Sequence, residues 1–220
     1  DARSGAQNWV YENDVPALSL RGTSSPLIID NFVIAAMANG TVVSIATDNG
    51  TLRWEERVAI PTGRSEIERL VDIDGDVLIN DAGLVLVTSY QGYLSAIDAV
   101  TGQTRWRTEA SSHVGTGFGF GNIYLADEQG KVTAYRSGQE AQVWSNESLL
   151  RRRLSTPHGF NNYLAVGDFE GYIHLLSQID GRIMARTRVD NDGVRGRMVS
   201  RGNTLYVYGN SGTLAALRVR

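Results

Sequence analysis

The sequence predicts an all-β protein, a partial β-propeller built from four-stranded antiparallel blades. Glycines that close the first tight turn of each repeat fall at positions 40, 92, 130, 171 and 212, with spacings of 52, 38, 41 and 41 residues. Within each repeat, short β-branched and apolar runs alternate with turn residues, a pattern typical of strands joined by hairpins. A tryptophan also returns at a fixed place in successive repeats. Four short strands per period of about 40 residues is the length of a propeller blade.

The repeats divide the chain into expected blades. Residues 1–12 carry Trp9 without the strands that elsewhere precede the tryptophan, so we expect the outer strand of a preceding blade there. Four full blades are expected over 16–60, 61–110, 111–149 and 150–190, and three strands of a last blade over 191–220. We treat 1–220 as one propeller unit. The mismatched ends allow either a closed five-bladed ring or a piece of a larger propeller.

The recurring tryptophan has a mechanical interpretation. A large flat side chain on the outer strand can fill the gap between neighbouring blades. We therefore expect Trp54 and Trp106 to be structural. The fourth repeat has Ala185 at this position, so the corresponding contact should be weaker there.

One repeat resembles a known propeller family closely. Residues 96–106, Ala-Ile-Asp-Ala-Val-Thr-Gly-Gln-Thr-Arg-Trp, are similar to the PQQ-like (quinoprotein) repeat, Ala-x-Asp-x-x-Thr-Gly-x-x-x-Trp. This resemblance implies eight blades in the intact propeller, and it favours a piece of a larger ring over a closed one. It predicts the fold well and the function poorly, because the repeat occurs in enzymes and binding proteins alike.

Composition excludes several kinds of function. The 220 residues include no cysteine, which removes disulfides and thiolate chemistry within these residues. No apolar run is long enough to span a membrane. The net charge of −3 is too small to suggest nucleic acid. Charge is uneven, however, with 10 basic and 19 acidic residues in 1–150 and 11 and 5 in 151–220. This uneven distribution of charge either orients a binding partner or reflects charged surfaces that simply face the solvent.

No cofactor, metal or catalytic site is expected. The three histidines, His113, His158 and His174, are not at metal-ligand spacing, so we expect structural roles. The glycines of 115–121 lack the strand–helix context of a phosphate loop. The acids between 66 and 81 lack the closing glutamate of a calcium loop, leaving exposed loop acids or partner binding. Residues 151–153, three arginines, are expected to be a surface feature between blades.

Two loops narrow the resemblance to the BamB family. Residues 15–22, Val-Pro-Ala-Leu-Ser-Leu-Arg-Gly, and residues 65–74, Ser-Glu-Ile-Glu-Arg-Leu-Val-Asp-Ile-Asp, look like two loops of that family. Residues 167–172, Gly-Asp-Phe-Glu-Gly-Tyr, are similar as well. The resemblance covers the whole chain. The family's lipidated N-terminal cysteine and first blades have no counterpart here, so a carboxy-terminal fragment is expected.

The resemblance implies a non-enzymatic scaffold of the outer-membrane β-barrel assembly (BAM) complex. Its partner would be BamA, bound through the POTRA repeats at the periplasmic face of the bacterial outer membrane. Unfolded β-barrel substrates would be a second class of partner, and the membrane would be reached only through the lipid anchor of the intact form. The partner-binding residues carried over by the resemblance are Leu18, Leu20, Arg21, Asp72 and Asp74.

The positions of the two loops in the repeat support the assignment of the partner-binding residues, and other interpretations stay open. Both loops precede the first strand of consecutive blades, so both should emerge on one face. Arg21 could instead tether adjacent blades internally through Asp72 or Asp74. Two other functions remain in view, a fragment of a PQQ-dependent quinoprotein dehydrogenase and a propeller sensor that binds a small ligand.

Overall fold

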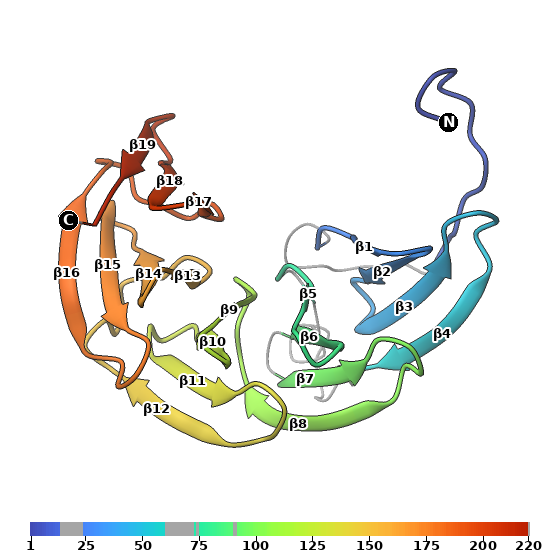
Figure 1. Cartoon of the computed structure of the whole chain (residues 1–220), viewed down its shortest axis with the longest axis horizontal. Coiled ribbons are helices and arrows are strands. Elements are labelled where there is room, and N and C mark those ends of the chain that lie inside the picture. The colour runs from blue at the N-terminus through green and yellow to red at the C-terminus, as the bar shows by residue number, and fades with distance from the viewer. Residues whose placement is uncertain (14–23, 60–72, 74, 90–91, 220) are drawn as a thin grey trace, which may run out of the picture. The chain divides into compact units, whose positions relative to one another are not determined.

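The computed structural model describes residues 1–13, 24–59, 73, 75–89 and 92–219. Every regular element in these ranges is a β-strand, from β1 to β19 (Figure 1). No helix long and apolar enough to cross a membrane occurs among the described residues. The chain divides into two compact units, residues 1–111 and 112–220. The expectation of a single unit over 1–220 therefore stays a prediction.

Unit 1 contains two four-stranded antiparallel sheets whose strands follow one another in sequence order. The first sheet consists of β1 (Leu27–Ile29), β2 (Phe32–Ala36), β3 (Thr41–Ala46) and β4 (Leu52–Arg57). The second consists of β5 (Leu78–Ile79), β6 (Leu84–Thr88), β7 (Gly92–Asp98) and β8 (Thr104–Ala110). A continuous core lies between the two sheets, in which Ile34, Val42, Val85 and Ile97 are fully buried.

Unit 2 repeats this organisation. One sheet consists of β9 (Thr116–Gly119), β10 (Asn122–Ala126), β11 (Val132–Arg136) and β12 (Gln142–Asn146). The next consists of β13 (His158–Phe160), β14 (Tyr163–Gly167), β15 (Tyr172–Ser177) and β16 (Ile183–Arg188). A three-stranded sheet follows, with β17 (Val199–Arg201), β18 (Thr204–Tyr208) and β19 (Leu214–Leu217). Two apolar clusters fill the spaces between successive sheets of this unit.

The glycines that revealed the repeat have a conformational role at the hairpins. Gly40 lies between β2 and β3 with φ of +80°, and Gly171 lies between β14 and β15 with φ of +82°. Both values are in the left-handed region that disfavours side chains. A Cβ at Gly40 would also lie 2.7 Å from the carbonyl oxygen of Ala59. Gly130 and Gly212 of the repeat also have positive φ, of +93° and +91°, so these four turns share one backbone requirement.

Trp54 and Trp144 join neighbouring sheets, as expected for Trp54, whereas the structural role of Trp106 stays a prediction. Trp54 on β4 donates from Nε1 to the carbonyl oxygen of Ala99 at 3.0 Å, and Trp144 on β12 donates to that of Gln178 at 3.0 Å. Each ring lies against a glycine of the next sheet, Gly102 and Gly181 respectively, where a Cβ would overlap it. A tryptophan side chain has a large apolar ring and one N–H hydrogen-bond donor. The ring therefore fills the space between two sheets, and the hydrogen bond fixes the position of one sheet against the next. Nε1 of Trp106 is buried and has no acceptor among the described residues.

The first thirteen residues differ in part from the expected outer strand. Residues 1–13 contain no strand, because a strand requires a pairing partner and no described segment pairs with them. Trp9 nevertheless behaves like the other tryptophans. Its Nε1 donates to the carbonyl oxygen of Thr47 at 2.9 Å, and its ring lies against Gly50.

Ala185 occupies the position that the repeats predicted for it. It pairs with Leu175 on β15, as Trp54 pairs with Ser44 in the first sheet. A groove of about 360 Å³ lies beside it, bordered by Leu175 of β15 and Leu205 of β18. The small side chain thus leaves open the space that tryptophan occupies at the preceding joint.

Candidate functional site

All five residues predicted to bind a partner lie outside the described residues. Leu18, Leu20 and Arg21 belong to the range 14–23, and Asp72 and Asp74 border Ile73, which is described alone. Their assignment stays a prediction.

The carboxyl ends of the two loops lie side by side in unit 1. The backbone N–H of Ser25 donates to Oδ1 of Asp76 at 3.3 Å. Ser24 is buried, and Ile73 is fully buried in the core of the unit. These residues lead into β1 and β5, the first strands of consecutive sheets. The loop ends are therefore fixed to the core and to each other.

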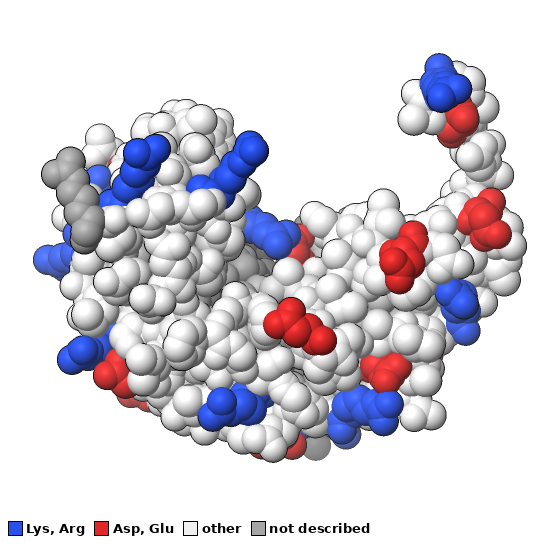
Figure 2. Space-filling view, in the orientation of Figure 1, with Lys and Arg blue, Asp and Glu red and all other residues white. Residues whose placement is uncertain are grey.

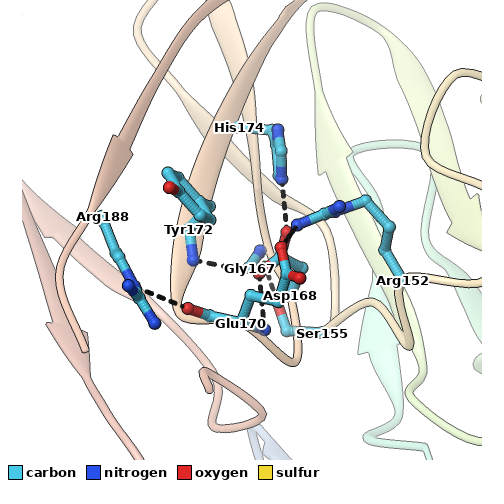
Figure 3. A network of polar contacts seen from close by, with 8 residues as sticks. All are labelled: Arg152, Ser155, Gly167, Asp168, Glu170, Tyr172, His174 and Arg188. Carbon is cyan, nitrogen blue, oxygen red and sulfur yellow. Dashed lines mark hydrogen bonds and ion pairs between the residues drawn. The ribbon is translucent and has the colours of Figure 1, made fainter. Parts of the chain in front are cut away.

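A second polar region, which the sequence did not single out as a site, lies in unit 2. It is centred on Asp168, which is fully buried at the end of β14 (Figure 3). Oδ1 of Asp168 accepts hydrogen bonds from the backbone N–H groups of Glu170 and Tyr172 at 2.9 and 3.0 Å. Oδ2 lies 2.6 Å from Nε of Arg152 and 2.7 Å from Nε2 of His174. The carboxylate thus has four partners from three segments of the unit.

These partners keep Asp168 ionised. Burial opposes ionisation, but the hydrogen bonds from His174, from the Tyr172 N–H and from Arg152 outweigh it and lower the pKa of Asp168 below its ordinary value. Burial likewise opposes the charge of Arg152, and its contacts with Glu170 and Asp168 more than compensate, so its pKa is raised. Within the described residues each charged side chain of the network therefore has a partner of opposite charge, which fits a structural role.

Arginines dominate the surface around this network. The guanidinium groups of Arg152, Arg186 and Arg188 lie 6.0, 5.4 and 5.7 Å from the ring centroid of Tyr172. Unit 2 as a whole has 13 basic and 9 acidic residues, against 8 and 15 in residues 1–111. Basic side chains predominate over the orange and red strands of unit 2 on the face in Figure 2. Of the run 151–153, Arg152 turns inward to the network and its two neighbours are exposed.

The described residues contain no cluster of three potential metal ligands. Nε2 of His158 is 3.0 Å from Oγ of Ser200. Burial and the nearby charge of Arg197 lower the pKa of His158. His174 belongs to the Asp168 network. Its position in the sequence did not predict this role, because the contact with Asp168 forms only when β14 and β15 pair.

Comparison with known proteins gives a consistent result. Residues 1–146 match the model of a family described as outer membrane protein assembly factor BamB. The chain is 50% identical over 209 residues to the protein of that name from Pseudomonas aeruginosa, which covers 95% of this chain and 55% of the relative. It is 35% identical over 206 residues to that of Escherichia coli, with coverage of 93% and 52%. The chain thus spans about half the length of these curated relatives.

Solved structures agree with the fold class. BamB from Moraxella catarrhalis superposes with a TM-score of 0.92 at 30% identity, over 100% of this chain and 65% of that one. This match confirms the predicted all-β propeller fold. A quinohemoprotein alcohol dehydrogenase from Comamonas testosteroni superposes with a TM-score of 0.67 at 15% identity, over 91% of this chain and 42% of that one. At that identity the likeness concerns the fold alone.

Proposed function

Because the chain belongs to the BamB family, we propose that it is a non-enzymatic scaffold of the machine that assembles β-barrel proteins into the bacterial outer membrane. The proposed partner is BamA, bound through its POTRA repeats. The proposed place of action is the periplasmic face of the outer membrane, where the intact protein is a lipoprotein. The names of the matched relatives, which describe an outer membrane protein assembly factor, support a role in that assembly.

The proposed partner surface consists of Leu18, Leu20 and Arg21 in one loop and Asp72 and Asp74 in the other. The observation that carries this proposal is the hydrogen bond from the Ser25 N–H to Asp76 Oδ1. It joins the described ends of both loops, so residues a few positions away on each loop can contribute to one continuous surface. Leucine beside arginine, close to carboxylates, has the composition of an interface hot spot.

The test is binding of the chain to purified BamA POTRA repeats by calorimetry, with Arg21→Asp and Leu20→Asp as variants. Loss of one member of a desolvated charge pair typically costs about 2–5 kcal/mol of binding, so Arg21→Asp should weaken the affinity at least about thirtyfold. Arg57→Asp, an exposed arginine on β4, is the matched control for the same charge change. Wild-type affinity in both loop variants would refute the proposed surface.

A double variant separates an interface from an internal tether. If Arg21 holds the loops together through an acid, Arg21→Asp should also lower the melting temperature, and adding Asp72→Arg or Asp74→Arg should restore it. If Arg21 contacts the partner, the single variant should melt like the wild type. Restored binding without any change in melting would indicate that the acids orient the interface.

A quinoprotein function has weaker support, because the likeness to the alcohol dehydrogenase is one of fold. Direct handling of unfolded β-barrel substrates fits the proposed scaffold role.

A further inference from the structure

Three guanidinium groups gather around one aromatic ring in unit 2, the ring of Tyr172 on β15. Those of Arg152, Arg186 and Arg188 lie 6.0, 5.4 and 5.7 Å from its centroid. The face of an aromatic ring attracts cations, but it does not neutralise their charge. The three like charges therefore repel one another unless carboxylates lie close to them.

Only one of these three charges has carboxylate partners among the described residues. Arg152 forms ion pairs with Asp168 and Glu170. Arg186 and Arg188 form no ion pair with a carboxylate in the described ranges. Nε of Arg188 donates to the carbonyl oxygen of Glu170 at 3.0 Å (Figure 3), which holds this side chain in place. Both arginines are exposed, so the surface presents two fixed cations without a counter-charge.

The other four-stranded sheets have a glutamate at this point of the chain. Counted from the place of the recurring tryptophan, the positions of Arg186 and Arg188 correspond to Glu55 and Arg57 in β1–β4, to Arg107 and Glu109 in β5–β8, and to Ser145 and Glu147 in β9–β12. Each of these pairs contains one acid, and none contains two cations. The two arginines are therefore a feature of the fourth sheet and not of the repeat.

An apolar recess adjoins the two arginines. A pocket of about 320 Å³ lies between the chain that follows β12 and the strands β15 and β16, and Arg186 forms part of its wall. Ile183 and Met184 also line it and are 40% and 46% exposed. An apolar side chain at the surface can therefore contact both of them.

The strand that carries the arginines has a free edge. β16 is the last strand of its sheet, and no described strand pairs with its outer edge. Such an edge presents backbone N–H and C=O groups to an extended chain. Arg186 and Arg188 are two residues apart on this strand, so their side chains lie on the same side of the sheet, ~7 Å apart along it. Alternate residues of an extended partner chain have the same spacing.

We propose that this surface binds an extended acidic segment of a partner protein. Two carboxylates at alternate positions of the segment pair with Arg186 and Arg188, and a neighbouring apolar side chain contacts Ile183 and Met184. A carboxylate can accept two hydrogen bonds from one guanidinium group. Charge complementarity indicates an acidic occupant. The spacing of the arginines along a free strand edge indicates a polypeptide, because lipid headgroups are not held at a fixed spacing.

Two peptides test the proposal on the whole 220-residue chain. The first, N-acetyl-Leu-Thr-Glu-Thr-Glu-Thr-Leu-amide, reads the same in both directions, and the second has glutamine in place of both glutamates. Binding is followed by NMR titration of the backbone amide signals. The acidic peptide should bind about tenfold more tightly, because each surface ion pair contributes up to about fivefold. It should shift the signals of β16, and added salt should reduce its advantage over the glutamine peptide.

A charge reversal locates the contact. Arg186→Glu should weaken binding of the acidic peptide about tenfold, because an attraction becomes a repulsion. Arg201→Glu, the same charge change at an exposed arginine on β17, should leave the affinity unchanged. The melting temperatures of both variants show whether they are folded. The comparison of the two peptides on the unaltered chain does not depend on the folding of either variant.

Equal binding of the two peptides, equal effects of the two charge reversals, or signal shifts that avoid β16 would each overturn the proposal. So would Arg186-dependent binding to phosphatidylglycerol vesicles without binding of the acidic peptide, which would assign the surface to anionic lipid. No residue of the two loops proposed to bind BamA is changed in these variants. Failure of this proposal would therefore leave the proposed BamA surface untouched.

Discussion

Two joints between neighbouring sheets of unit 2 are built from different side chains. At the joint between the β9–β12 and β13–β16 sheets, Trp144 is 8% exposed and lies against Gly181. Arg152 crosses the same joint to Asp168. At the next joint, toward β17–β19, the equivalent outer-strand residue is Ala185, and a groove of about 360 Å³ remains. The same repeat therefore allows two kinds of joint between sheets. In one, a tryptophan side chain fills the space, and in the other an alanine leaves a groove.

The largest effect should come from emptying the filled joint. Trp144→Ala removes a buried aromatic side chain and its hydrogen bond to the Gln178 carbonyl, which should cost about 3–5 kcal/mol of unfolding free energy. Chemical denaturation of the variant and the wild type measures it. A cost below about 1 kcal/mol would mean that the tryptophan does not hold the joint.

The polar half of the same joint should come next. Asp168→Asn leaves Arg152 and His174 with a neutral partner and should cost about 3 kcal/mol, as for breaking a buried ion pair. Because the folded pKa of Asp168 is lowered, its ionisation stabilises the fold above its unfolded pKa of about 4, and this stabilisation is lost as pH falls further. Melting temperatures from pH 3 to 7 should therefore converge for wild type and variant at the acid end. Parallel curves would contradict the role of the charge.

The smallest effect should come from filling the open joint. Ala185→Trp adds apolar surface to a groove that already has room and should stabilise unit 2 by about 0.5–2 kcal/mol, as cavity-filling changes commonly do. Ala185→Ser is a control that changes the residue without filling the groove. A destabilised tryptophan variant would show that backbone geometry, and not side-chain size, keeps this joint open.

The sheets could be predicted because their determinants are local. Turn glycines at 40, 130 and 171 have positive φ, and Trp9, Trp54 and Trp144 each meet a glycine that the repeat itself supplies. The Asp168 network could not be predicted, since its partners Arg152 and His174 are brought together only by pairing across segments. The strand expected near Trp9 stays a prediction for a related reason, because pairing depends on a second segment and no described segment pairs with residues 1–13. The partner residues stay predictions that rest on family resemblance.

A further consequence follows from the sequence order of the strands. In all five sheets the hydrogen-bonded neighbours are consecutive segments of the chain, so each sheet is complete within a short stretch of polypeptide. Such local pairing has a low entropic cost of closure and favours rapid formation. A chain that emerges end first, as during synthesis, can therefore complete one sheet before the next has emerged. Strands without any pairing partner would then be limited to the most recently emerged segment, which reduces the opportunity for aggregation.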